Sequence, residues 1–175
     1  MCEMCDGKSF QQVLDDTRDH VRRFGWAVRG VQAEEGRPGW VCTVGLLDSY
    51  EHPELVVFDD DWFRGASLLN ALGRAVRDGE ELVPGDHLGL GEGAAAHVVD
   101  VHPDHLGTEV FAMWHNVRRV GTVTPPDELL AHQVVLLHPE AGQQGADGIR
   151  LDRPAPPSPA TPPPPPWEWP RLRAG

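Results

Sequence analysis

The sequence changes character at Arg153, and this change limits how much of the chain can fold. The last segment reads RPAPPSPATPPPPPWEWPRLRAG. Proline fixes φ and carries no backbone N–H, so such a run forms neither a helix nor a central strand. We therefore predict a single domain over residues 1–151 and a disordered, proline-rich tail over residues 152–175. A domain of this length can bury a substantial core.

Hydrophobic periodicity predicts two principal helices. The first runs from Ser9, an N-cap residue, to Phe24, and Gly25 can end it in the left-handed conformation. The second follows three aspartates and runs from Trp62 to Asp78. The residues expected to point inward recur at helical spacing: Phe10, Val13, Leu14, Thr17, Val21 and Phe24 in the first helix, and Trp62, Phe63, Ala66, Leu69, Leu72, Ala75 and Val76 in the second.

Short β-branched and aromatic runs predict strands between and after these helices. Residues 25–32 and 39–46 form the two arms of a predicted hairpin, and three more strands are expected at residues 54–58, 96–102 and 133–138. Residues 81–93 read as a glycine-rich connection. The order of elements predicts the α+β class, with two principal helices packed on a mainly antiparallel sheet.

Charge and hydropathy exclude several kinds of partner. Fifteen basic and twenty-seven acidic residues give a formal net charge of −12, which repels nucleic acid and anionic membrane surfaces. No stretch approaches the roughly 20 apolar residues of a membrane-spanning helix, and the N-terminus lacks the pattern of a signal peptide. We therefore expect a cytoplasmic protein with no nucleic-acid or membrane partner. Three cysteines make no disulfide framework, so reduced thiols are expected.

Four short motifs occur in a characteristic order. They are CEMCDG at the N-terminus, FGWAV at the end of the first helix, WVCTVGL in the hairpin and HPELVVF after it. This combination resembles the bacterial family known as domain of unknown function 4262, over roughly residues 1–140. Cys42 stands where many relatives have tyrosine, and the family's usual C-terminal aspartate-glycine-aromatic-proline-tryptophan sequence is not matched. The resemblance implies no particular activity.

The N-terminal pair Cys2 and Cys5 is a candidate metal site. Two thiolates supply half of a tetrahedral zinc site, and the other two ligands would have to come from elsewhere. His20 and His52 are the nearest histidines in the sequence, and Cys42 is a third thiol. Zinc is therefore the metal to expect, with a redox pair or two idle thiols at a frayed terminus as the alternatives.

The segment TVGLLDSYEHPEL is the second candidate site. A polar loop after a strand is a common place for binding, because the sheet fixes one end of the loop. Thr43, Gly45 and His52 are the candidate cofactor- or ligand-binding residues, with His52 able to act as an acid, a base or a ligand. The alternative is a surface turn. A third cluster, His102, Asp104 and His105, reads as the polar end of a strand, and it is the next metal candidate.

Two classes of function remain open. The first is a module that binds a small ligand or a protein partner, with or without a metal at Cys2 and Cys5. The second is an enzyme, for which the best version is a flavin-linked oxidoreductase, by analogy with split-barrel flavin reductases. No set of catalytic residues can be identified in the sequence, and neither the ligand nor the oligomeric state can be predicted.

Overall fold

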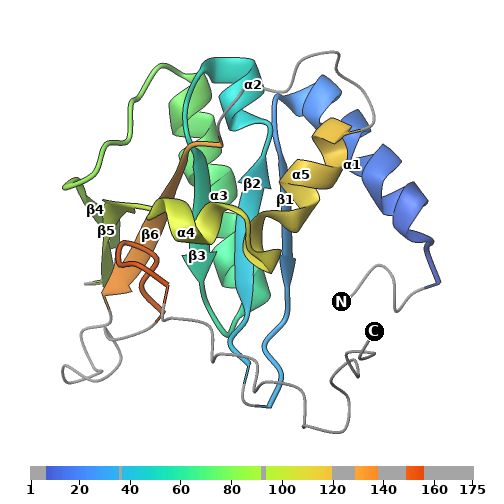
Figure 1. The fold of residues 1–175 in the computed structure, drawn as a ribbon. Coiled ribbons are helices and arrows are strands. Elements are labelled where there is room, and N and C mark those ends of the chain that lie inside the picture. The colour runs from blue at the N-terminus through green and yellow to red at the C-terminus, as the bar shows by residue number, and fades with distance from the viewer. Residues whose placement is uncertain (1–6, 36, 92–93, 120–128, 138–148, 156–175) are drawn as a thin grey trace, which may run out of the picture.

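A six-stranded mixed sheet forms the centre of the molecule. The computed structural model describes residues 7–35, 37–91, 94–119, 129–137 and 149–155. The strands lie in the order β1-β2-β3-β6-β5-β4 (Figure 1). They are β1 (Ala27–Val31), β2 (Trp40–Val44), β3 (Glu54–Phe58), β4 (His87–Gly91), β5 (Ala94–Asp100) and β6 (Ala131–Leu137).

All neighbouring strands in this sheet run antiparallel except one pair. The hairpin strands β1 and β2 pair from Ala27 opposite Val44 to Val31 opposite Trp40. Strands β3 and β6 run parallel, with Glu54 opposite Ala131. The predicted α+β class with a mainly antiparallel sheet is therefore confirmed.

Helices cover both faces of the sheet (Figure 1). Helix α3 (Trp62–Arg77) packs on one face, mainly over β1, β2 and β3. On the other face lie α1 (Phe10–Phe24), α4 (Pro103–Leu106), α5 (Ala112–Arg119) and a short 3-10 helix, η1 (Glu109–Phe111). The five-residue helix α2 (Leu46–Tyr50) joins β2 to β3 at one end of the sheet.

The two principal helices begin where the sequence predicts. At the start of α1 the Gln12 N–H donates to the Ser9 hydroxyl, and the Ser9 N–H donates to the Gln12 side chain, which is a capping box. Gly25 ends this helix with φ +89°. Asp61 caps α3 by accepting from two backbone N–H groups of the first turn.

Each face of the sheet carries its own hydrophobic core. Under α3 the core includes Trp26, Leu55 and Leu69, and on the opposite face it includes Val56, Phe111 and Trp114. Leu55 and Val56 are neighbours in β3 and neither is exposed to solvent. The central strand is therefore buried on both sides, as expected for a sheet between two helical layers.

Several sequence expectations were wrong. Residues 87–91, expected in a connection, form the edge strand β4, and residues 46–50, expected to end a strand and begin a loop, form α2. Phe10, Phe24 and Phe63 were expected to point inward, but their exposed fractions are 45%, 57% and 64%. Periodicity places these rings on the apolar side of a helix, but each lies in the first or last turn of its helix.

Within the described ranges, no helix combines the length and apolar character needed to cross a membrane. The predicted tail lies outside the described residues from residue 156 onward, so its disorder stays a prediction.

Gly45 occupies a position where a side chain does not fit. It follows β2 directly and precedes α2, with φ +114°, so it does not lie inside a strand as the sequence suggested. A Cβ atom built there would lie 2.8 Å from Val21 Cγ1 and 2.9 Å from the Gly25 carbonyl oxygen. The bend therefore depends on glycine both for its backbone angle and for the close approach of α1.

We expect Gly45→Ala to lower the free energy of unfolding by at least about 1–3 kcal/mol, the usual cost of such backbone strain, with the contact to α1 adding to it. Gly89→Ala is the matched control, because a Cβ atom there has open space around it. Urea unfolding of both variants and the wild type measures the difference. Equal stability of the two variants would contradict the assignment.

Candidate functional site

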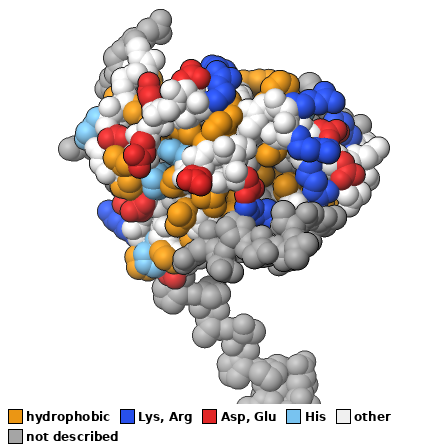
Figure 2. Space-filling model, turned by 90° about the horizontal axis from the view of Figure 1, so that it is seen from above, with side chains coloured by type: hydrophobic (Ala, Val, Ile, Leu, Met, Phe, Trp, Pro, Cys, Tyr) orange, Lys and Arg blue, Asp and Glu red, His pale blue; other side chains and the backbone are white. Residues whose placement is uncertain are grey.

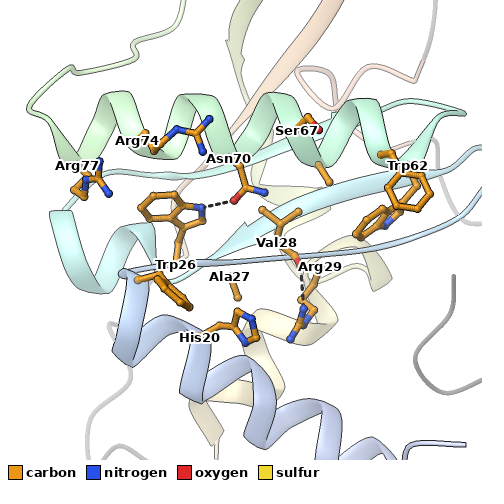
Figure 3. A pocket seen from close by; sticks show the side chains of 13 residues that line it. His20, Trp26, Ala27, Val28, Arg29, Trp62, Ser67, Asn70, Arg74 and Arg77 are labelled. Atoms are coloured by element: carbon orange, nitrogen blue, oxygen red, sulfur yellow. Dashed lines mark hydrogen bonds between the residues drawn. The ribbon is translucent and has the colours of Figure 1, made fainter. Parts of the chain in front are cut away.

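A groove of about 540 Å³ lies at the free β1 edge of the sheet. Helix α3 forms one wall, the C-terminal part of α1 forms the other, and β1 runs between them (Figure 3). Neighbouring residues of β1 point to opposite sides of the strand. The groove therefore receives Val28 on the α3 side and Ala27 and Arg29 on the α1 side.

Positive charge is concentrated in this groove. Arg29, Arg74, Arg77 and His20 are among its thirteen lining residues, and none of the thirteen is Asp or Glu. The whole chain, by contrast, carries twenty-seven acidic residues and a net charge of −12. On the face seen in Figure 2, Lys and Arg side chains lie among Asp and Glu side chains. The groove is therefore a local cationic site on an acidic protein.

The three arginines of the groove differ in their contacts with the rest of the protein. Arg29 Nε donates to the Thr17 hydroxyl (2.8 Å) and Nη1 donates to the Val28 carbonyl (3.1 Å), so neutral oxygens and not a carboxylate hold this side chain. The Arg74 side chain makes no hydrogen bond or ion pair with the described residues. Arg77 pairs with Asp78 at an exposed position (3.1 Å), where ion pairs contribute little.

Aromatic side chains supply the apolar part of the groove. Trp26 is 6% exposed, and its indole N–H donates to the Asn70 side-chain oxygen (3.1 Å). A Cβ atom on Gly73 would lie 2.6 Å from the Trp26 ring, so this glycine lets the indole pack flat against α3. Trp62 and Phe63 form an edge-to-face pair, 5.4 Å between centroids, near the start of the helix. Cationic, aromatic and amide groups thus line one hollow, a combination suited to an organic anion.

The segment TVGLLDSYEHPEL forms a buried hydrogen-bond network. The Glu54 carboxylate lies at its centre and is fully buried. It accepts from the Thr43 hydroxyl (2.7 Å), from the Gly45 N–H (2.7 Å), and from the N–H groups of Leu46 and Leu47 (3.3 Å each). These bonds satisfy the first backbone donors of α2. Burial raises the pKa of the Glu54 carboxyl above its ordinary value, against the lowering effect of these hydrogen bonds.

Two predicted binding residues therefore contact the protein itself. The Thr43 hydroxyl is unexposed; besides donating to Glu54 it accepts from the Leu55 N–H (2.8 Å). Gly45 fixes the bend between β2 and α2. In this structure both residues position the chain and present no open group to a ligand.

His52 also bonds within the protein through both ring nitrogens. Nδ1 donates to the Pro53 carbonyl (2.7 Å), and Nε2 accepts from the Leu82 N–H (3.2 Å). The Leu82 carbonyl lies 3.1 Å from Nδ1 of His132, whose Nε2 lies 3.2 Å from Asp100. The two imidazoles thus hold the connection between α3 and β4 against the sheet, and His52 has no ring nitrogen open to a metal or substrate.

A family model described as domain of unknown function (DUF4262) matches residues 20–125, more than half of the chain. The chain belongs to the DUF4262 family. No curated protein and no solved structure matches the chain in the other two comparisons. The matched segment contains the whole groove, from His20 to Arg77, and the Glu54 network. It begins after Cys2 and Cys5.

The structure of this DUF4262 protein does not show the four predicted metal ligands side by side. Cys2 and Cys5 lie outside those residues. His20 lies on exposed α1 at the groove, with Nδ1 2.9 Å from the Asp16 carbonyl. No group of three or more His, Cys, Asp and Glu side chains arranged to hold a metal occurs in the described ranges. The zinc hypothesis for Cys2 and Cys5 stays a prediction.

Cys42 is a buried thiol in the DUF4262 domain. It is 1% exposed, and its thiol donates to the Val110 carbonyl (3.5 Å). Burial, followed by the negative charge of Glu54, raises the pKa of this thiol to about 12. At neutral pH it is therefore protonated, and thiolate is the form that binds metal or reacts.

The turn at residues 102–105 begins α4, and its histidines make hydrogen bonds within the protein. His102 caps the helix by accepting from the Asp104 N–H (3.3 Å), and Nε2 of His105 lies 2.8 Å from the Arg153 carbonyl. These contacts occupy one ring nitrogen of each histidine with a backbone group of the protein. The interpretation as the polar end of a strand describes this turn better than a metal site does.

A second hollow of about 890 Å³ lies between α3 and strands β4 to β6. Its lining consists mostly of leucine, alanine and glycine. Arg64, its one arginine, is held by two hydrogen bonds to Asp59 (2.7 and 2.6 Å). The charged group is thus already neutralised, and the β1 groove remains the better candidate site.

Sequence reasoning missed most of the groove. A signal was present in α3: Phe63, Ser67, Asn70, Arg74 and Arg77 follow one another at spacings of three and four, and the helix contains no acidic residue. Such spacing places these side chains on one face of a helix. That Arg29 and His20 lie opposite this face depends on the packing of α1 and β1.

Glu54→Gln is expected to lower the free energy of unfolding by about 2–4 kcal/mol, because an amide N–H₂ would face buried donors and leave them without an acceptor. Urea unfolding measures the change. Glu51→Gln is the matched control, since Glu51 is exposed and lies in the same connection. Wild-type stability of Glu54→Gln would mean that the carboxyl does not hold this turn together.

His132 makes the stability of the domain dependent on pH. Burial lowers its pKa, with Asp100 acting in the opposite direction and His52 in the same one. As the pH falls, His132 is therefore protonated in the unfolded chain, near pH 6.5, before it is protonated in the folded protein. The free energy of unfolding decreases over the range between about pH 6.5 and the lower pKa of the folded state. We expect a smaller loss of unfolding free energy between pH 7.5 and 5.5 in His132→Gln than in the wild type. His20→Gln, an exposed control, should keep the wild-type loss; an unchanged loss in His132→Gln would contradict the assignment.

Proposed function

We propose that this DUF4262 protein is a binding module for a small organic anion, which it takes up in the groove between α1, β1 and α3. One observation carries the proposal. Three arginines and a histidine line this groove without any acidic side chain, although the chain as a whole has a net charge of −12. Thirteen positions drawn at random from this composition would include about two acidic residues on average.

The size and lining of the groove support a small molecule as the ligand. Its volume of about 540 Å³ falls in the usual range of small-molecule sites, which combine apolar walls with a few polar groups. Arginine suits the binding of carboxylate and phosphate groups because its planar fork can donate two parallel hydrogen bonds. Aromatic walls add affinity for the apolar part of such a ligand.

Binding explains the groove better than catalysis does. The lining contains one histidine and one serine, His20 and Ser67, and no hydrogen bond joins them in the described structure. The flavin alternative depended on analogy with split barrels, which are closed. The described strands form one open sheet with free edges at β1 and β4, which gives that analogy no support.

The proposal is tested with anilinonaphthalene sulfonate, an aromatic anion whose fluorescence rises on binding. Arg74→Gln combined with Arg77→Gln should raise its Kd at least about tenfold, since two charge-assisted hydrogen bonds are lost. Arg37→Gln combined with Arg153→Gln is the matched control; it removes the same charge from exposed positions outside the groove.

The control should bind the probe as the wild type does, and binding to the wild type should weaken as salt is added. Equal Kd values for the two double variants would overturn the proposal. Equal values are expected if the probe binds instead in the apolar second hollow, between α3 and strands β4 to β6.

A further inference from the structure

Polarity changes along the α3 wall of the groove. Trp62 and Phe63 lie at the start of the helix, Ser67 and Asn70 lie in the middle, and Arg74 and Arg77 lie toward its end (Figure 3). The groove therefore offers aromatic rings at one end, hydrogen-bonding groups in the middle and cations at the other end.

The separation of the two ends sets the length of a ligand that contacts both. Arg74 is twelve positions after Trp62, a rise of about 18 Å along the helix axis. Side chains on a helix lean toward its N-terminus, and Figure 3 shows the Arg74 side chain extending toward Asn70. Because the ring of Trp62 leans in the same direction, the two ends are separated by a distance on the order of the axial rise, which is longer than a simple inorganic anion.

The aromatic end has ring surface available for stacking. Phe63 is 64% exposed, and Trp62 is half-buried beside it in an edge-to-face pair. An exposed aromatic pair on a groove wall can stack on a planar ring.

The middle of the α3 wall has hydrogen-bond donors without a partner among the described residues. The Asn70 side-chain oxygen accepts from Trp26, whereas its amide nitrogen makes no hydrogen bond to the described residues. The Ser67 hydroxyl, on the exposed side of α3, likewise makes none with them. These groups lie where hydroxyl-bearing or carbonyl-bearing parts of a ligand would pass between the two ends.

From this order of groups we infer that the ligand carries a planar ring at one end and a polyanionic group at the other, joined by a polar linker, which is the chemistry of a nucleoside diphosphate or triphosphate. The ring stacks on Trp62 and Phe63, the linker contacts Ser67 and Asn70, and the phosphates contact Arg74 and Arg77. This inference rests on the proposed function, because it assigns a chemical class to the ligand of the same groove.

Displacement of anilinonaphthalene sulfonate by three competitors tests the inference: ADP, inorganic pyrophosphate and adenosine. ADP should displace the probe at a concentration at least about tenfold lower than either of the others. Stacking of the base, which pyrophosphate lacks, and the charge-assisted hydrogen bonds of the phosphates, which adenosine lacks, each contribute about that much or more. Arg74→Gln combined with Arg77→Gln should weaken the binding of both ADP and pyrophosphate.

Phe63→Leu should weaken the binding of ADP and leave the binding of pyrophosphate unchanged. Phe63 is chosen because it is exposed, so its substitution leaves the core intact, whereas Trp62 packs against the core. Displacement by ADP no better than by pyrophosphate, or unchanged ADP binding in Phe63→Leu, would overturn the nucleotide assignment.

The two proposals fail in different ways. Probe binding that depends on Arg74 and Arg77 but is not displaced by ADP would overturn the nucleotide class and leave an anion-binding groove. Probe binding that is insensitive to both arginines would overturn the groove itself, and the nucleotide assignment with it.

Discussion

The buried Glu54 carboxylate determines how the chain turns between β2 and β3. A charge without solvent contact is costly unless hydrogen bonds compensate, and here the Thr43 hydroxyl and three consecutive backbone N–H groups from Gly45 onward provide them. Because these donors come from the end of β2 and the start of α2, one side chain of β3 fixes both elements. Ser49 of α2 in turn donates to the Gly25 carbonyl at the end of α1 (2.7 Å), so the same turn positions the helix that borders the groove.

The groove exists because α1 and α3 pack on opposite faces of the sheet and neither covers its β1 edge. Trp26 closes the space between β1 and α3 through its hydrogen bond to Asn70, and the absence of a side chain at Gly73 permits the contact. On the other side the Arg29 side chain is fixed by Thr17 of α1. Contacts within the protein thus hold both walls of the groove in place.

The sequence predicted the parts of this molecule that depend on local pattern. The start of α1 at its Ser9 cap, the end at Gly25 and the limits of β3 follow from capping residues and β-branched runs, and all agree with the structure. Strand β4 was missed because HLGLG contains no β-branched residue. Glu54 was expected at the start of a strand, but its buried hydrogen-bond partners could not be predicted, since they lie seven to eleven positions earlier in the chain. The groove was missed for the same reason: its arginines converge only once α1, β1 and α3 are packed.

The acidity of the protein and the cationic groove act over different distances. At physiological ionic strength the Debye length is about 8 Å, so most of the twenty-seven carboxylates are screened from a molecule inside the groove. The arginines that line it act at hydrogen-bond distance, where screening is weak. Net negative charge repels large polyanions such as nucleic acids, which would have to approach many carboxylates at once. If the proposed function holds, a small anion meets only the groove, and the charge pattern then selects ligands by size as well as by sign.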